Sequence, residues 1–489
     1  MMLKLPVLEA RTTVAMHDNE HASRTTPSAT PSLAGYQHVA GRKLYVETYG
    51  CQMNINDSEI VMGVMHKNGY AITDKPDDAD VILLNTCAIR DNAERKIHER
   101  LNHLKFYKKK RNELVVGVLG CMAERMRTQL VEEKKIVDLV VGPDEYRALP
   151  QLVAKAFHGE KGIAVKLSRV ETYDDIEPLR TEGISAWISI SRGCDKFCTF
   201  CVVPFTRGRE RSRGLQLIVD EVQRLWDNGF KEVTLLGQNV NSYRDEEYTS
   251  GQGADFADLL AATARAVPQM RIRYTTSHPY DMSDKLIATM AEHDNICKYI
   301  HLPVQSGSNR VLKLMNRHYT VEHYIERMRT IKEYMPQCAL STDIIVGFPT
   351  ETEEDHRMTV ELMGEVRYDG AYMFKYSPRE RTKAWKMEDD VPDEVKTRRL
   401  NEIIEQQQRI AFEINQKAIG STERVLVEGA SKRNPKEWQG RTDSNKVVIF
   451  PHLTDEITGK TAGYVVGDII TVAIQRATSA TLFGEIVHS

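Results

Sequence analysis

Three apolar runs in the first third of the chain predict three strands of one sheet. Residues 42–49 alternate between apolar and polar positions, whereas the runs 80–86 and 114–119 are almost continuously apolar. Alternation is typical of a half-buried strand, and a short continuous run is typical of a fully buried one. Helical stretches separate the three strands. Strands that alternate with helices indicate βαβ units, so the pattern predicts a Rossmann-like parallel α/β domain.

The alternation of strands and helices resumes after residue 180. The predicted strands are 186–191, 232–236, 271–276, 299–304, 340–346 and 370–376. Helical stretches such as 214–228 and 321–335 lie between them. Six βα units in succession predict a partial (β/α)6 barrel of the TIM type, in which the loops after the strands carry the chemistry.

The last part of the chain changes to an all-β pattern. A charged helical stretch from Pro392 to about Lys417 precedes it. Short strands with glycine turns follow at residues 423–428, 446–450, 468–474 and 481–487. This pattern favours a small OB-like β-barrel, a fold that binds oligonucleotides in many proteins and serves as a protein-interaction module in others.

These changes of pattern divide the chain into segments, with a linker-like stretch over residues 143–180. The segments are a disordered leader (1–40), an N-terminal α/β domain (41–158), a barrel core (180–410) and a β-barrel tail (413–489). The leader is rich in Ser, Thr, Pro and Ala and lacks the apolar core of a secretory signal. A chain of 489 residues is too long for one core, so several domains are expected.

The composition of the chain limits its partners and its cellular compartment but does not indicate a function. The chain is 41% hydrophobic and 28% charged, and its formal net charge of −3 argues against indiscriminate binding to nucleic acid. Two local basic patches, 105–111 and 206–213, either contact phosphates or are solvated faces. No run approaches the ~20 apolar residues that span a bilayer. Eight cysteines without the density of a secreted scaffold indicate a reducing compartment, so we expect a cytoplasmic protein without a membrane partner.

The most specific chemical motif is the CxxxCxxC spacing of Cys194, Cys198 and Cys201. Soft thiolates suit iron–sulfur clusters, which are normally held by four cysteines. Three thiolates leave one iron of a cubane free to bind a small molecule. The alternative is a zinc knuckle, but zinc sites pair such a motif with a second pair of ligands. The nearest downstream cysteine is Cys297, so the spacing favours the cluster.

Three further cysteines each follow a predicted strand of the N-terminal domain. Cys51, Cys87 and Cys121 are far apart in the sequence, and two of them directly follow a glycine. In open α/β sheets ligands sit beyond the carboxyl ends of the strands, so this topology gathers the three on one edge. The alternative is that they are ordinary buried cysteines. Their repeated placement at strand ends favours a second three-thiolate site.

These features together resemble the radical methylthiotransferases over roughly residues 41–489. The resemblance rests on the segments Thr48–Asn54, Asn85–Ala93, Gly120–Glu124 and 194–201, and on a tail similar to the TRAM module. The first two segments resemble the branch called MiaB, which acts on transfer RNA, rather than the branch that modifies a ribosomal protein. One departure is Arg381, where the family usually has glycine.

The resemblance implies two [4Fe-4S] clusters and S-adenosyl-L-methionine as cofactors. Cys194, Cys198 and Cys201 would hold the cluster that cleaves S-adenosylmethionine to a 5′-deoxyadenosyl radical. Cys51, Cys87 and Cys121 would hold an auxiliary cluster that supplies sulfur. The implied reaction is methylthiolation of carbon 2 of N6-isopentenyladenosine at position 37 of tRNA. That carbon is unactivated, which is why acid–base chemistry would not suffice and radical chemistry is expected.

The resemblance also implies partners and cofactor contacts. The partners would be a tRNA anticodon stem-loop bearing isopentenyladenosine, a flavodoxin- or ferredoxin-type electron donor, and an iron–sulfur assembly system. The candidates for contacts to S-adenosylmethionine are Gln238, Gln305, Ser306 and Ser308 in loops after the barrel strands, and Asp343 inside one strand. The alternative for each is a role in a tight turn or a helix cap. Cys297 and Cys338 are expected to pack in the core, and His278 and His301 to be structural. A rival hypothesis is a non-catalytic RNA-binding or cluster-assembly protein, which would need neither cysteine triad.

Overall fold

A computed structural model describes residues 41–87, 91–180, 183–248, 253–434, 436–452 and 464–487. The chain divides into two compact units, one ending at Glu182 and the other beginning at Gly183. The predicted leader, residues 1–40, lies outside the described residues. We describe each unit by itself.

The first unit is built on a six-stranded sheet in which every neighbouring pair is parallel. In spatial order the strands are β2 (Ala71–Ile72), β1 (Lys43–Thr48), β3 (Val81–Thr86), β4 (Val115–Gly120), β5 (Leu139–Val141) and β6 (Gly162–Ala164). The predicted Rossmann-like parallel domain is therefore confirmed. The sequence did not reveal β2, β5 and β6, because strands of two or three residues are too short to show a period.

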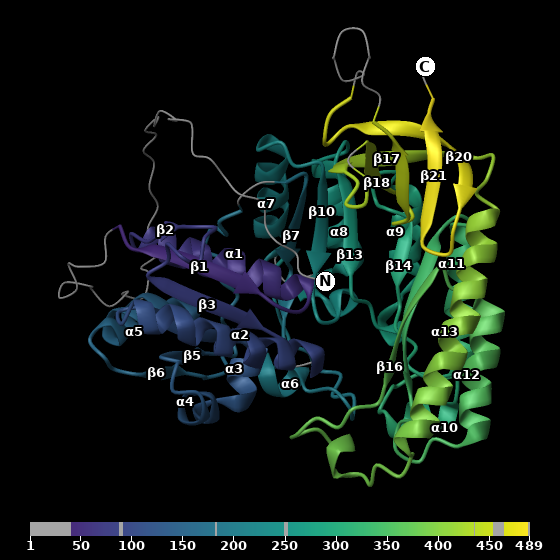
Figure 1. Ribbon diagram of the computed structural model, residues 1–489. Coiled ribbons are helices and arrows are strands. Elements are labelled where there is room, and N and C mark those ends of the chain that lie inside the picture. Colours follow the sequence, from purple (N-terminus) through teal and green to yellow (C-terminus); the bar gives the residue numbers. More distant parts are fainter. Residues whose placement is uncertain are drawn as a thin grey trace. The chain divides into compact units, whose positions relative to one another are not determined.

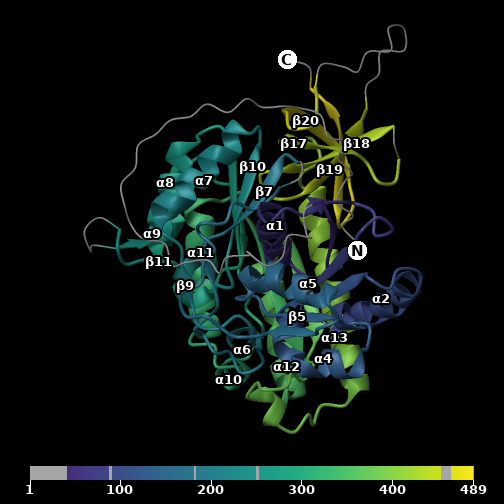
Figure 2. The same ribbon diagram turned by 90° about the vertical axis from the view of Figure 1, so that its left-hand side faces the viewer.

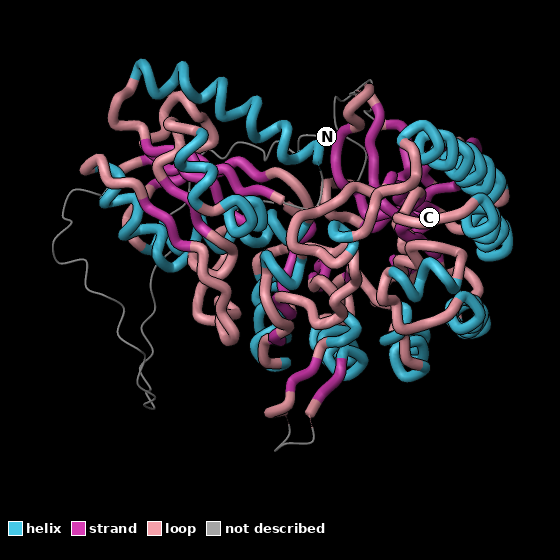
Figure 3. Tube along the Cα trace, turned by 90° about the horizontal axis from the view of Figure 1, so that it is seen from below, coloured by secondary structure: helices cyan, strands magenta, loops and turns pink. Residues whose placement is uncertain are grey.

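Both faces of this sheet are covered by helices, which explains the continuous apolar runs. Helices α1 (Gln52–Lys67) and α5 (Leu149–Phe157) share one apolar cluster with Val81 and Leu83 of β3. Helices α2 (Asp91–Lys110), α3 (Cys121–Met126) and α4 (Thr128–Glu133) share the other with Ile82 and Leu84. Figure 3 shows helices on both sides of the strands.

The stretch 143–180, predicted as a linker, instead belongs to the first unit. It contains a short 3-10 helix η1 (Tyr146–Ala148), α5 and β6. Beyond β6, Tyr173 is only 2% exposed, and its ring stacks on that of Tyr146 with the centroids 5.7 Å apart. Farther on, the Leu179 amide donates to the Glu59 carbonyl of α1 at 2.9 Å. The sequence suggested a linker because Pro, Gly and charged residues are mixed along this segment.

The second unit contains the six predicted barrel strands, all parallel to their neighbours within two hydrogen-bonded groups. One group is β7 (Ser185–Ser189), β10 (Glu232–Leu236) and β13 (Arg271–Thr275), and the other is β14 (Tyr299–His301), β15 (Ala339–Val346) and β16 (Gly370–Lys375). The groups meet where the Cys297 amide donates to the Ile272 carbonyl at 2.9 Å. The partial (β/α)6 barrel is confirmed (Figure 1).

Helices cover the outer face of this barrel (Figure 2). They are α7 (Leu215–Asp227), α8 (Phe256–Ala266), α9 (Asp284–Glu292), α10 (Asn309–Leu314), α11 (Val321–Tyr334), α12 (Glu353–Val366) and α13 (Asp393–Gln416). Alternate strand residues such as Ile188 and Val233 pack with them in one large core. The intervening residues point to the inside of the barrel, which we call the lumen, and many are polar, including Thr234, Arg273 and Asp343. None of the described helices is both long and apolar enough to cross a membrane.

The tail forms a closed five-stranded barrel, as the sequence predicts for a small β-barrel. Its strands are β17 (Thr422–Ala430), β18 (Glu437–Thr442), β19 (Val447–Pro451), β20 (Ile469–Ala477) and β21 (Thr481–Ile486). Strand β18 was not predicted, because its sequence, EWQGRT, offers little apolar alternation. Its Gly440 allows a close approach to β17, since a Cβ there would lie 2.2 Å from the Leu426 carbonyl oxygen. The last turn of α13 lies beside β20, where Gln416 Nε2 donates to the Ala477 carbonyl at 3.0 Å (Figure 1).

Candidate functional site

The loop of Cys194, Cys198 and Cys201 follows the first barrel strand, as expected for this fold. A short ladder between β8 (Ser191–Arg192) and β9 (Arg211–Ser212) brackets it. Gly193 between ladder and loop has φ of +80°, and a Cβ there would lie 2.0 Å from the Arg209 carbonyl oxygen. Only glycine fits this position, which explains the Gly-Cys194 pair.

A segment at the end of α10 holds the middle of the cysteine loop. The Thr199 amide donates to the Met315 carbonyl at 3.0 Å, and Thr199 Oγ1 donates to the Leu314 carbonyl at 2.9 Å. Asn316 Nδ2 donates to the Phe197 carbonyl at 3.1 Å. The β8–β9 ladder and the end of α10, which are far apart in the sequence, therefore both hold the cysteine loop in place.

The three thiols of this loop interact electrostatically with one another. Burial raises the pKa of Cys194 and of Cys201 to about 12, and the neighbouring Cys198 raises both further. Backbone amides oppose the shift, from Lys196 for Cys194 and from Val203 for Cys201. Thiols crowded in this way stay protonated unless positive charge is supplied, and metal ions supply it by displacing the protons.

The donor set fits an iron–sulfur cluster better than a single ion. Among the described residues no three His, Cys, Asp or Glu side chains converge on one metal position. A cubane distributes its ligands over several irons, so its thiolates stand farther apart than those around one zinc ion. Three cysteines on one short loop provide the soft donors that such a cluster takes.

The second set of cysteines lies at the carboxyl ends of three adjacent strands. Cys51 follows β1, Cys87 follows β3, and Cys121 follows β4. Strand β3 pairs in parallel with β1 on one side and with β4 on the other. The sheet thus brings together residues far apart in the sequence, at the edge where open α/β sheets bind ligands. The same soft donor set is present as in the second unit.

The glycines before two of these cysteines permit close packing at the sheet edge. Gly50 has φ of +125°, and a Cβ there would lie 2.5 Å from Cys87 Cβ. Gly120 has φ of +87°, and a Cβ there would lie 2.7 Å from the Thr86 carbonyl oxygen. The Gly-Cys pairs that stood out in the sequence therefore mark the places where the three loops touch.

Two buried asparagine side chains connect the loops at this edge of the sheet. Asn54 Nδ2 donates to the Tyr49 carbonyl at 3.0 Å, and Asn85 Nδ2 donates to the Asn54 carbonyl at 2.8 Å. Both asparagines are completely buried. They join the loops after β1 and β3, which explains why the segments YGCQMN and NTC carry polar residues beside an apolar core.

The predicted cofactor contacts occupy two of the barrel loops and strand β15, and some of them bond to other residues of the protein. Ser308 caps α10, and its Oγ donates to Asp355 Oδ1 at 2.5 Å. Ser306 Oγ accepts the Ser308 amide at 3.2 Å. Gln305 has φ of +75°, and its backbone pairs with β15. These hydroxyl groups therefore stabilise the start of the helix.

The two other predicted contacts are Asp343, which lies in the lumen, and Gln238, which has a buried oxygen without a partner among the described residues. Asp343 Oδ1 lies 3.4 Å from His301 Nε2 inside the lumen. Gln238 follows β10, and its Oε1 is buried without a hydrogen-bond partner among the described residues. His301, expected to be structural, bonds Ser341 Oγ through Nδ1 at 2.9 Å, so it links two lumen strands.

Sequence reasoning missed other polar groups at the same end of the barrel. Buried polar atoms without a partner among the described residues are Ser191 Oγ, Asn239 Oδ1, Ser277 Oγ and His278 Nε2. They follow β7, β10 and β13, so they gather beyond the carboxyl ends of those strands. Buried polar groups are nearly always bonded, so this group suits a polar ligand. A loop position after a strand was the only available signal.

The surroundings of His278 determine which of its ring nitrogens can donate a hydrogen bond. Its Nδ1 accepts the Tyr280 amide at 3.2 Å, so the remaining ring nitrogen, Nε2, carries the proton in the neutral form. Burial, then Arg317 and Lys196, hold the pKa of His278 well below its usual range. His278, which we expected to be structural, therefore offers an N–H donor.

Two exposed aromatic residues interrupt the polar lumen. Tyr372 and Phe374 lie on one face of β16 and are 54% and 38% exposed. The opposite face of the strand meets α13, where Lys375 bonds Asp393 at 2.7 Å. The ring of Tyr372 lies edge-on to that of His301, with centroids 5.7 Å apart, so this aromatic face points into the lumen.

The basic patches differ from each other. In 206–213, Arg207, Arg211 and Arg213 are buried, and Arg213 pairs with Glu221 at 2.9 Å, so these three arginines are structural. In 105–111, Lys105, Lys109 and Lys110 are exposed. That stretch also presents Phe106, which is 59% exposed beneath the Lys110 ammonium group.

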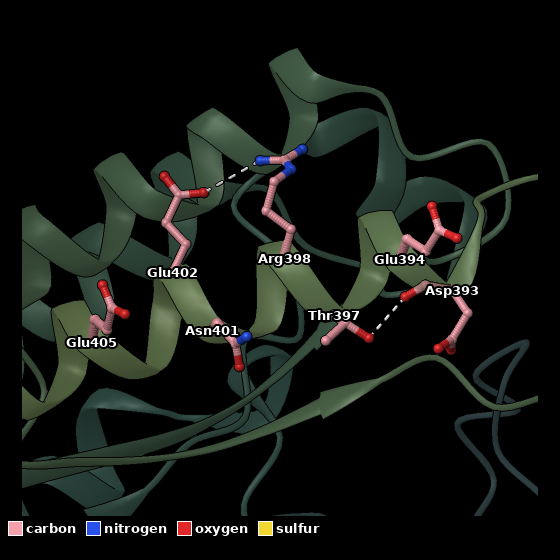
Figure 4. Close-up of a pocket in the computed structure, with 7 residues that line it drawn as sticks. All are labelled: Asp393, Glu394, Thr397, Arg398, Asn401, Glu402 and Glu405. Atoms are coloured by element: carbon pink, nitrogen blue, oxygen red, sulfur yellow. Dashed lines mark hydrogen bonds and ion pairs between the residues drawn. The ribbon is translucent and has the colours of Figure 1, made fainter.

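Features outside these sites are structural. Cys297 and Cys338 are buried, as predicted for core residues. A shallow hollow on the outer face of α13 is lined by Asp393, Glu394, Thr397, Arg398, Asn401, Glu402 and Glu405 (Figure 4). Arg398 and Glu402 form an ion pair across one helical turn at 3.7 Å. The hollow is a solvated helix surface, and no strand end opens into it.

Three families match successive parts of the chain. Residues 43–142 match the uncharacterized protein family UPF0004, residues 188–363 match the radical SAM superfamily, and residues 416–487 match the TRAM domain. The first match contains Cys51, Cys87 and Cys121, and the second contains the CxxxCxxC loop.

Solved structures are similar to this chain in fold. A radical S-adenosylmethionine methyltransferase, TsrM, from Kitasatospora setae, with tryptophan substrate and a SAM analogue bound, superposes with a TM-score of 0.54. The superposition covers 80% of this chain and 79% of that protein at 14% sequence identity, so it supports the fold alone.

Curated relatives are much closer in sequence. The tRNA-2-methylthio-N(6)-dimethylallyladenosine synthase of Chloroherpeton thalassium is 53% identical over 450 residues, which are 91% of this chain and 97% of that protein. The synthase of the same name from Bacteroides thetaiotaomicron is 54% identical over 447 residues, covering 91% and 96% of the two chains. Similarity of this extent spans both cysteine sites and the β-barrel, and the chain belongs to the family of tRNA-2-methylthio-N(6)-dimethylallyladenosine synthases.

Proposed function

We propose that this chain is a radical SAM methylthiotransferase that modifies tRNA, acting on carbon 2 of N6-isopentenyladenosine at position 37. The observation that carries this proposal is 53% identity to a synthase of that name over nearly all of both chains. The product is 2-methylthio-N6-isopentenyladenosine. A ribosomal-protein substrate is disfavoured, because both relatives described above are named as enzymes that modify an adenosine of tRNA.

We propose the six cysteines as cluster ligands, and their position at the ends of strands supports this. Cys194, Cys198 and Cys201 hold the cluster that binds S-adenosylmethionine, and Cys51, Cys87 and Cys121 hold the auxiliary cluster. When bound, the two [4Fe-4S] clusters and S-adenosylmethionine supply the one-electron chemistry and the sulfur that an unactivated carbon requires. The first cluster belongs to residues 180–410, and the second belongs to residues 41–158.

The chain's own residues bind the reactants and exclude water. The unsatisfied groups Ser191, Ser277 and His278 Nε2–H offer polar contacts to the cofactor beyond the ends of the first strands. Gln238 and Asp343 face the same loops and lumen. The aromatic face of Tyr372 and Phe374 suits a splayed adenine with an apolar side chain, since bases stack on aromatic side chains in RNA recognition.

The partners follow from this function. The substrate is the anticodon stem-loop of tRNA, and the RNA-binding module is the β-barrel, which lies in the segment matched by the TRAM domain. An electron donor of the flavodoxin or ferredoxin type and an iron–sulfur assembly system are required by the clusters. We propose a cytoplasmic location, because the substrate is tRNA and cluster ligation requires reduced cysteines.

The decisive test is mass spectrometry of tRNA nucleosides from a strain that lacks this protein. We expect 2-methylthio-N6-isopentenyladenosine to disappear and its precursor to accumulate. Complementation with the native protein restores the product, whereas Cys198→Ala does not. Cys297→Ala is the matched control, because Cys297 is a buried core cysteine. Persistence of the product at normal levels in the deletion strain contradicts the proposal.

A further inference from the structure

Arg317 is a buried cation directed at one of the cluster thiols. It is 6% exposed and follows α10. Its Nη1 donates to Cys198 Sγ at 3.2 Å. Its Nη2 donates to the Pro303 carbonyl at 2.8 Å, and Nε donates to the Tyr319 hydroxyl at 2.9 Å. The whole guanidinium edge is thus occupied, and its orientation is fixed.

The approach of Arg317 to the thiol is built into the fold rather than set by one rotamer. The residues just before it hold the cysteine loop, through the Met315 carbonyl to the Thr199 amide at 3.0 Å and through Asn316 Nδ2 to the Phe197 carbonyl at 3.1 Å. A shift of the loop would therefore carry the end of α10 with it. Arg317 and Cys198 keep their separation because one backbone network positions both.

Charge explains why an arginine occupies this position. Among the described residues, the groups that accept hydrogen bonds from Arg317 are a sulfur, a hydroxyl and a backbone carbonyl, and none of them is a carboxylate. A buried guanidinium without an anion is costly, and the sulfur of Cys198 is the cluster-ligand atom that its Nη1 contacts. Backbone amides of Lys196 and Val203 act on Cys194 and Cys201, and the charges of Lys196 and Arg317 also reach these two thiols. Cys198 differs because its sulfur accepts a hydrogen bond from the guanidinium group itself.

We propose that Arg317 sets the reduction potential of the cluster held by this loop, by donating a charge-assisted hydrogen bond to Cys198. Reduction adds one electron and makes the cluster more negative. A fixed cation and an N–H donor at a ligand sulfur stabilise that form and raise the potential. The inference rests on the proposed function, because it assumes a cluster at this loop. Arg317 acts through the cluster and does not contact substrate.

The test uses full-length protein in which Cys51, Cys87 and Cys121 are changed to Ala, so that one cluster is observed. Anaerobic reconstitution should give about four irons per chain. A redox titration followed by electron paramagnetic resonance then compares this parent with Arg317→Gln. At a given applied potential, we expect the ratio of reduced to oxidised cluster in Arg317→Gln to be tenfold lower than in the parent. This corresponds to a shift of the reduction potential of about −59 mV for a one-electron couple.

Two further variants separate charge from structure. Arg317→Lys keeps the positive charge and is expected to retain most of the parent's potential. Tyr319→Phe removes the hydroxyl that accepts from Nε but leaves Nη1 on the sulfur, so its potential should match the parent's. An unchanged potential in Arg317→Gln with full iron content overturns the inference.

A measurement on the parent covers the case in which Arg317→Gln loses its cluster. Protein labelled with 15N-arginine should show a nitrogen hyperfine coupling to the reduced cluster in electron–nuclear double resonance. Absence of that coupling refutes the contact. Absence of iron from the parent is a different failure, because it refutes the cluster assignment itself and with it the proposed function.

Discussion

Arg381 adopts a backbone conformation that suits glycine. Its φ is +72°, in the left-handed region. A non-glycine residue pays roughly 1–2 kcal/mol for this conformation. We therefore expect Arg381→Gly to raise the free energy of unfolding of the second unit by about 1 kcal/mol. Urea unfolding followed by tryptophan fluorescence measures this, because Trp187, Trp226, Trp385 and Trp438 all lie in that unit.

The control for this prediction lies two residues away. Lys383 has φ of −66° and ψ of −39°, an ordinary right-handed conformation. Glycine there gains nothing and adds flexibility to the unfolded chain, so Lys383→Gly should lower stability by about 0.5–1 kcal/mol. Equal effects of the two substitutions would show that loop entropy, and not the left-handed φ, decides stability.

At the residue scale, the sequence was informative where chemistry and spacing coincide. The six cysteines could be placed at strand ends because each follows a readable strand. Ser191, Ser277 and the Nε2 of His278 could not be found in this way. Their significance depends on having no partner in three dimensions, and a single serine after a strand has many ordinary roles.

Among the elements, the sheet edge of the first unit depends on the glycines before its cysteines. Gly50→Ala puts a Cβ 2.5 Å from Cys87 Cβ, so one of the two loops must move. We expect reconstituted iron to fall from about eight to about four per chain, with the second unit still loaded.

Gly159→Ala is the matched control for that prediction. Its φ of +83° imposes similar backbone strain, but nothing lies within 4 Å of the added Cβ. The control should keep the native iron content. Loss of iron in both variants would attribute the effect to strain rather than to contact between the cysteine loops.

The lumen face of β16 makes a second prediction at this scale. Stacking of a base on an aromatic side chain contributes about 1–3 kcal/mol. Tyr372→Ala and Phe374→Ala should therefore weaken binding of an anticodon stem-loop with isopentenyladenosine by about tenfold, and the unmodified hairpin by less. Fluorescence anisotropy compares the two RNAs. Met373→Ala is the control, because Met373 packs against the helical core. Equal losses for both RNAs would contradict a role in recognising the alkyl group.

The strands of the second unit show which elements the hydrophobic pattern can predict and which it cannot. Barrel strands such as β10 and β15 were readable because outer residues are apolar and alternate with lumen residues. Strand β18 was not, because it is held by pairing with β17 and β19 and by the absence of a side chain at Gly440. Its stability comes from neighbours, which a single sequence window does not contain.

At the scale of the whole molecule, the second unit joins its β-barrel to the start of strand β13. Arg271 donates to the Arg441 and Arg424 carbonyls, each at 2.8 Å. Arg273 donates to the Thr442 carbonyl at 2.7 Å and pairs with Glu232 at 2.8 Å. The β-barrel therefore sits at the amino-terminal end of β13, whereas the cysteine loop follows the carboxyl end of β7. No pattern in the sequence pointed to this contact.

The arginines of β13 are therefore expected to couple the stability of the β-barrel to that of the larger barrel. Arg271→Ala leaves two carbonyls without their charged donor, and hydrogen bonds to charged groups contribute about 1.5–3 kcal/mol. We expect the free energy of unfolding of the second unit to fall by about 2–3 kcal/mol in tryptophan-monitored urea titrations. Arg424→Ala is the control, because its carbonyl stays in place while an exposed side chain is removed. Equal unfolding of the two variants would mean that the contact is incidental. A clear difference would mean that deleting the β-barrel also disturbs the catalytic barrel, so RNA binding must be tested with point substitutions on the β-barrel surface.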